Sequence, residues 1–108
     1  MKVYEVEYTL WNNHEWNHDT CKRIVTAESE SEAKQKIVNM SDMNCERTVE
    51  HVRQINVGDK IRIVKMVDVE KYNNTEGKIT KIDDMGQLHG TWGGLALIPE
   101  VDDFEVIR

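Results

Sequence analysis

Short segments in which apolar and polar residues alternate make up most of the sequence. In the first of them, Val3–Leu10, the residues Tyr4, Val6 and Tyr8 share the more apolar side. Alternation with period two, in segments rich in β-branched and aromatic residues, is typical of strands that are half covered by a core. The same reasoning predicts further strands at residues 21–27, 47–55, 60–67, 76–82, 87–92, 95–98 and 104–107.

One segment departs from the alternation and predicts a single helix. Ser29 followed by Glu32 fits a capping box, in which each side chain satisfies a free backbone N–H at the start of a helix. Ala33, Ile37 and Met40 then follow at helical spacing. We therefore expect residues 1–56 to form a β-β-α-β module, with residues 11–20 as a polar connection between its first two strands.

The second half, residues 57–108, shows strands and turns only. Asn56–Asp59 is a turn and marks the expected boundary, and a hairpin turn is predicted at Gly93–Gly94. Five short strands with closely spaced turns favour a small barrel. The predicted fold class is therefore α+β, with the β-β-α-β module followed by a five-stranded barrel.

Three strings in the second half also resemble a known family. They are G-D-K-I-R-I-V-K-M at 58–66, E-G-K-I-T-K-I-D-D-M-G-Q-L-H-G-T-W-G-G at 76–94 and D-D-F-E-V-I at 102–107. The resemblance is to the small SH3-like barrel described as domain of unknown function 4314, found largely on phages and mobile elements of Gram-positive bacteria. It implies an SH3-like barrel and a mobile-element setting, and it implies no activity. The first half is similar to small β-β-α-β modules that accompany phage genes.

Charge and hydropathy exclude several classes of protein. The chain has 14 Lys and Arg against 20 Asp and Glu, a net charge of -6, which argues against charge-driven binding to nucleic acid. It has no apolar run of membrane-spanning length and no apolar core of a secretory signal. Two cysteines without an export signal indicate a reducing compartment, so we expect a cytoplasmic protein.

Residues 14–18 read H-E-W-N-H, the H-E-x-x-H string of zinc hydrolases. That chemistry needs two His on one helix face and a Glu that activates water. The string lies in a predicted connection among turn-forming residues, so a small zinc hydrolase using Glu15 is only an alternative. The sequence contains no nucleophile–base signature, and we expect a protein that is not an enzyme.

The same connection suggests a structural metal site. If the helix returns across the sheet, Cys45 lies near the connection and near Cys21, so that His14, His18, Cys21 and Cys45 would form a tetrahedral zinc site. The alternatives are four unliganded residues, or a Cys21–Cys45 disulfide in an oxidising compartment. Further candidate ligands are Asp19 and His51.

Three tryptophans have two interpretations each. Trp11 and Trp16 in the connection could form a partner-binding surface, because Trp is enriched at interface hot spots, or could cover a sheet edge. Trp92 could stack bases, which would favour a nucleic-acid accessory module, or it could belong to the core.

Four aspartates are further candidates for partner binding. Acidic turns can mimic phosphates toward a basic partner or can simply be solvated. The aspartates in question are Asp83, Asp84, Asp102 and Asp103. By size, acidity and setting the chain resembles anti-CRISPR proteins, so the predicted function is docking on a host protein, a CRISPR nuclease, to block DNA loading or activation.

Overall fold

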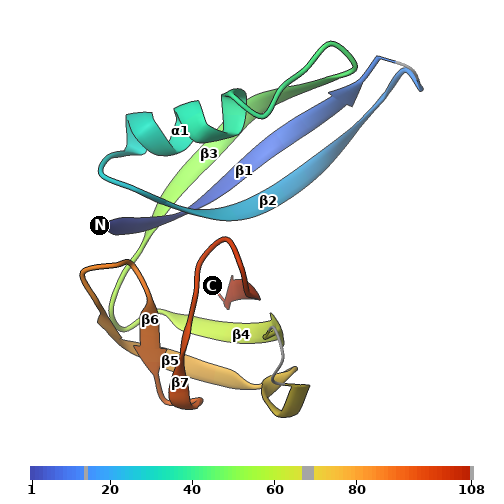
Figure 1. Cartoon of the computed structure of the whole chain (residues 1–108). Helices are drawn as coiled ribbons and strands as arrows, with labels where there is room; N and C mark the ends of the chain where they lie inside the picture. Colours follow the sequence, from blue (N-terminus) through green and yellow to red (C-terminus); the bar gives the residue numbers. More distant parts are fainter. Residues whose placement is uncertain (14, 67–69, 108) are drawn as a thin grey trace. The chain divides into compact units, whose positions relative to one another are not determined.

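The structure is a computed structural model that describes residues 1–13, 15–66 and 70–107 (Figure 1). The chain divides into two compact units, residues 2–54 and residues 55–108. More than half of the described chain lies in strands, and the described residues form one α-helix. No helix in these ranges has both the length and the apolar character needed to cross a bilayer.

The unit of residues 2–54 is a three-stranded sheet with one helix. Its elements are β1 (Lys2–Asn12), β2 (Asn17–Ala27), α1 (Glu30–Val38) and β3 (Cys45–Ile55), and the sheet order is β2-β1-β3. β1 and β2 pair antiparallel over their whole length, from Lys2 opposite Ala27 to Asn12 opposite Asn17. Two contacts fix the direction of β3: the Asn13 N–H donates to the Asn44 carbonyl and the Thr9 hydroxyl to the Glu50 carboxylate, so β3 runs antiparallel to β1.

Helix α1 packs against β1 and β2 and closes the core of this unit (Figure 1). The helix begins where the capping residue predicts, because Ser29 Oγ accepts the Glu32 N–H at 3.2 Å. Such a cap contributes about 1 kcal/mol to stability. The core consists of alternate residues of the two strands together with the inner face of the helix, and its buried members are Tyr4, Val6, Tyr8, Val25, Ala27, Ala33 and Ile37.

The unit of residues 55–108 is a five-stranded antiparallel sheet in the order β7-β6-β5-β4-β8. Its elements are β4 (Lys60–Lys65), the 3-10 turn η1 (Glu70–Tyr72), β5 (Glu76–Ile82), β6 (Leu88–Gly90), β7 (Gly93–Leu97) and β8 (Asp103–Ile107). Apolar residues alternate along these strands, since each strand buries one face. The large apolar side chains that are buried from β4 onward are Ile61, Ile63, Met66, Ile79, Leu88, Trp92, Leu97 and Phe104.

The predicted α+β class is wrong: the fold is mostly β, with two antiparallel sheets and one nine-residue helix. The predicted barrel is not closed either. In the described ranges the second sheet ends at β7 on one side and β8 on the other. Several strands are longer than the sequence pattern predicts. Backbone pairing extends through polar residues that alternation alone assigns to loops.

Two turns differ from the prediction for the same reason. The polar connection expected at residues 11–20 is mostly strand, since β1 continues to Asn12 and β2 begins at Asn17. The hairpin turn expected at Gly93–Gly94 lies instead at Thr91–Trp92, where Gly90 pairs with Gly93 across the hairpin. In both hairpins the register, rather than the local composition, decides which residues turn.

Candidate functional site

The turn of the β1–β2 hairpin exposes an aromatic side chain. Trp16 is 80% exposed and its backbone is left-handed, with φ of 54°. A left-handed conformation is uncommon outside glycine and is an outlier for a bulky residue. The Trp16 N–H donates to the Asn12 carbonyl at 2.9 Å, and this bond holds the turn in the strained conformation. The large side chain is therefore presented to solvent by a defined backbone.

Trp11 and His18 support Trp16 from the strands below it. They are directly opposite each other in β1 and β2, and their rings stack at a centroid distance of 6.2 Å. The Trp11 ring also meets the Trp16 ring edge to face, 6.3 Å between centroids. The Trp11 indole N–H donates to Asn13 Oδ1 at 2.5 Å. The three rings form one continuous aromatic group at this end of the sheet.

The loop between α1 and β3 is tied to the same hairpin. The Asn13 side-chain amide donates to the Met43 carbonyl at 2.9 Å, and the Asn13 backbone N–H donates to the Asn44 carbonyl at 2.8 Å. Met43 is 91% exposed. Trp16 and Met43 are thus two strongly exposed apolar side chains on loops that hydrogen bonds link to each other. We call Trp11, Trp16, His18 and Met43 the tip surface.

Asp42 fixes the loop that carries Met43. Asp42 Oδ1 accepts the backbone N–H groups of Asn44 and Cys45, each at 2.8 Å. These bonds, first that from Cys45 and then that from Asn44, lower the pKa of Asp42, and the Arg47 charge adds to the effect. Met43 is therefore held at its position by a carboxylate-capped turn.

Exposed acidic residues lie close in the sequence to the residues of the tip surface. The exposed carboxylates of this end of the unit are those of Glu15, Asp19, Asp42 and Glu46. Glu15 Oε2 accepts the side-chain N–H of Asn17 at 3.3 Å, so it is partly engaged in the turn. An apolar centre with an acidic border is complementary to a partner surface with an apolar pocket and a basic rim.

The fold does not bring together the predicted zinc ligands that it describes. His18 and Cys21 lie three residues apart in β2, so they point to opposite faces of the sheet. Cys21 packs against the core cluster, opposite Tyr8, whereas His18 is on the face of Trp11. His14 is outside the described residues.

Cys45 does return to the end of the sheet that carries the hairpin turn, as the path of the chain predicts. It lies in β3, however, while Cys21 lies in β2 on the other side of β1 and four residues further from the turn. Two strand spacings and four residues put their Cα atoms roughly 16 Å apart, whereas sulfurs that share one zinc are about 4 Å apart.

Both described cysteines are free thiols, and the described residues contain no group of three or more His, Cys, Asp or Glu arranged around a common centre. Asp19 and His51, the spare candidates, are exposed residues of β2 and β3. Zinc binding by this chain stays a prediction, which metal analysis of the purified protein tests. The H-E-x-x-H geometry is not formed by the described part of the string, because residues 15–18 are a turn followed by the start of β2.

Two of the four predicted partner-binding aspartates have structural roles. Asp102 is 7% exposed and its carboxylate accepts the Ile98 N–H at 2.8 Å. Asp83 accepts the N–H groups of Met85 and Gln87 and lies 3.0 Å from His89 Nε2. The His89 and backbone contacts lower the pKa of Asp83.

Asp84 and Asp103 are exposed. The acidic residues available to a partner on the second unit are therefore fewer than the sequence suggests.

Trp92 belongs to the core of the second unit. It is 6% exposed, and its indole N–H donates to the Leu95 carbonyl at 2.8 Å. Its ring lies against Gly77 and Gly90, where an added Cβ would approach ring atoms to 3.0 and 2.2 Å. A buried ring has no free face on which a base could stack, so the structure favours the core interpretation of this residue.

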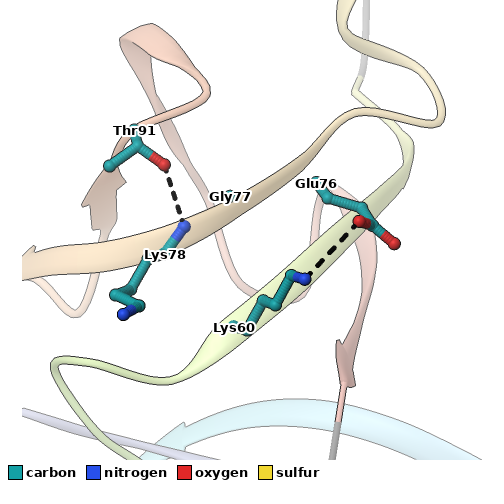
Figure 2. A pocket seen from close by; sticks show the side chains of 5 residues that line it. All are labelled: Lys60, Glu76, Gly77, Lys78 and Thr91. Atoms are coloured by element: carbon teal, nitrogen blue, oxygen red, sulfur yellow. Dashed lines mark hydrogen bonds and ion pairs between the residues drawn. The ribbon is translucent and has the colours of Figure 1, made fainter.

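A shallow depression of about 460 Å³ lies on the surface of the same unit (Figure 2). Its lining residues come from β4, β5 and the β6–β7 turn, and they are Lys60, Glu76, Gly77, Lys78 and Thr91. Lys60 Nζ lies 3.7 Å from Glu76 Oε2, and Thr91 Oγ1 accepts the backbone N–H of Lys78 at 3.0 Å.

The sequence analysis identified the two tryptophans of the tip surface. It missed Asn13 and Asp42, whose hydrogen bonds hold the two loops in place. The D-M-N string at 42–44 is a turn signal that could have indicated Asp42 as a cap. The proximity of Asn13 to Met43 and that of Lys60 to Lys78 depend on strand register, which local pattern does not supply.

Comparison with known proteins gives one match. No curated protein matches the chain, and no solved structure does. The family model for a domain of unknown function, DUF4314, matches residues 45–107, which include β3 as well as the whole second sheet. Because the match covers more than half of the sequence, the chain belongs to the DUF4314 family.

Proposed function

We propose that the chain is a non-enzymatic binding protein that docks on a partner protein through the tip surface. The observation that carries the proposal is the exposure of Trp16 and Met43 on two loops that hydrogen bonds hold together. Exposed loops normally carry small polar residues, whereas these two linked loops each expose a large apolar side chain, the Trp16 indole and the Met43 thioether.

Preorganisation makes such a surface effective. Trp residues are enriched among interface hot spots because they bury a large area with few rotatable bonds. The Asn13 contacts and the Asp42 cap already fix the backbone of both loops, so docking orders little further chain. Less conformational entropy lost on association leaves more of the contact energy as affinity.

The charge indicates the kind of partner. The chain carries a net charge of -6, and carboxylates border the tip surface. Such a surface is steered toward a basic partner, with an association rate that falls as salt rises. An RNA-guided nuclease has basic nucleic-acid channels. In its specific form, the proposal is an anti-CRISPR-type inhibitor acting in the cytoplasm of a bacterial host.

The test uses a purified CRISPR nuclease with its guide RNA. We expect the wild-type chain to co-elute with the nuclease complex and to reduce DNA cleavage at molar excess. The variant Trp16→Ala should weaken binding at least tenfold, in the range of a hot-spot residue. Met85→Ala is the matched control, because Met85 is also an exposed apolar side chain, 75% exposed, in a turn of the other unit.

Two outcomes would contradict the proposal at different levels. Undiminished cleavage and no complex with the nuclease would remove the anti-CRISPR form. A captured partner from the natural host that binds wild type and Trp16→Ala equally well would remove the tip surface as the docking site.

A further inference from the structure

We propose that the depression on the second unit binds a single carboxylate, supplied by an acidic side chain or the C-terminus of a peptide. The inference does not rest on the proposed function, because it concerns the binding of a negatively charged ligand, whereas the tip surface is proposed to meet a basic partner. The two sites also lie in different units. It starts from an arrangement of like charges that is unfavourable for the fold alone.

Lys60 and Lys78 are directly opposite each other in the β4–β5 pair. Side chains at such positions have their Cβ atoms about 5 Å apart, and like charges placed there destabilise a sheet. Glu76 compensates Lys60 only, and Lys78 has no carboxylate partner among the described residues. Figure 2 shows Lys60 turned toward Glu76 and the Lys78 side chain extending away from that pair.

The depression contains further hydrogen-bond donors for a ligand close to the uncompensated charge of Lys78. Thr91 Oγ1 accepts the Lys78 backbone N–H, which leaves the hydroxyl hydrogen for donation to a ligand. A Cβ at Gly77 would lie 3.0 Å from Thr91 Oγ1 and 3.0 Å from the Trp92 ring, so glycine there allows the β6–β7 turn to approach β5 and bring Thr91 to Lys78. Lys78 has a flexible stem and three N–H donors, so its ammonium can follow a bound oxygen.

The local charge favours a monoanion. Lys60 and Lys78 contribute two positive charges and Glu76 one negative charge, so one carboxylate brings the site to neutrality. A polyanion such as DNA is disfavoured by the net charge of -6 on the whole chain. A volume of about 460 Å³ also exceeds what a bare ion fills and leaves room for the residue that carries the carboxylate.

The experiment is an NMR titration of the full chain, followed through the backbone amide shifts. The carboxylate probes are acetyl-Glu-amide and acetyl-Gly-Gly-Gly with a free C-terminus, which distinguish the two sources. Inorganic phosphate and a short single-stranded DNA are the comparison ligands. We expect saturable shifts at Gly77, Lys78 and Thr91 with at least one carboxylate probe, and weaker responses to phosphate and DNA.

Lys78→Gln should weaken carboxylate binding about three- to fivefold, as expected for one charge-assisted contact at an exposed site. It should leave the fold at least as stable, since it removes a like-charge pair. Lys81→Gln is the matched control, because Lys81 is an exposed lysine of the same strand outside the depression, and it should change affinity less than twofold. The proposal is overturned if no probe gives saturable shifts at these three residues, if Lys78→Gln and Lys81→Gln behave alike, or if DNA binds more tightly than both carboxylates.

Discussion

Two tryptophans at the turns of two β-hairpins have opposite environments. Trp16 lies at the β1–β2 turn, exposed, with its backbone left-handed. Trp92 lies at the β6–β7 turn, buried, with its indole N–H bonded to the Leu95 carbonyl. Both are flanked by polar or glycine residues in the sequence, so local composition does not distinguish them.

The neighbours across the sheet make the difference. Gly77 and Gly90 have no side chains, and the space they leave is filled by the Trp92 ring. The Trp16 ring meets the Trp11 ring edge to face, and the Trp16 side chain stays 80% exposed. Whether a tryptophan at a turn is buried or exposed thus depends on the residues that the fold places around it.

The largest expected effect is the loss of the buried ring. Trp92→Ala should lower the free energy of unfolding by about 3–5 kcal/mol, because it removes a core side chain and leaves a cavity. Trp16→Ala should change it by less than about 0.5 kcal/mol, as for other exposed positions. Urea unfolding followed by circular dichroism measures both. Equal losses would show that the two turns do not differ as described.

A smaller effect is expected from filling the space beside Trp92. Gly90→Ala places a Cβ 2.2 Å from Trp92 Cζ3 and 2.5 Å from the Lys78 carbonyl, and such overpacking costs about 1–3 kcal/mol. Gly94→Ala is the control in the same hairpin, because a Cβ there meets no atom within 4 Å. If both variants unfold at the wild-type denaturant midpoint, the close packing of Trp92 on Gly90 is wrong.

The smallest effect concerns the two capped turns, one in each unit. The folded-state pKa values of Asp42 and Asp83 are lowered, so each carboxylate contributes stability above its ordinary pKa that is lost as pH falls through the lower folded value. Asp42→Asn and Asp83→Asn should therefore be less stable than wild type near neutral pH, and the difference should shrink below about pH 4. Denaturant midpoints across this range test the sign, which a deficit that grows on acidification would contradict.

Local signals in the sequence predicted the elements whose determinants are close together. The Ser29 cap fixed the start of α1, and the alternation of residues 76–82 gave the bounds of β5. The same approach failed for most of residues 11–20, because a hairpin pairs their backbone, Trp11 with His18 and Asn12 with Asn17, despite their polar neighbours. The fold class was misjudged for this reason, since each unrecognised extension lengthens a strand.

The prediction of the candidate sites depended on where the strands were expected to begin and end. Trp11 and Trp16 were identifiable from residue type, whereas the predicted zinc ligands were grouped on the assumption that residues 11–20 form a connection between two strands. Once β2 begins at Asn17, period-two geometry separates His18 from Cys21. The pair of Lys60 and Lys78 becomes visible only when the β4–β5 register is known.

The family match begins at Cys45, the first residue of β3, yet the sheet partner of β3 is β1, which lies before the match. The shared segment thus contains an eleven-residue strand whose backbone pairing in this chain is completed from outside it. Without residues 2–27 this strand would present an unpaired edge, and an edge of that length promotes association between chains.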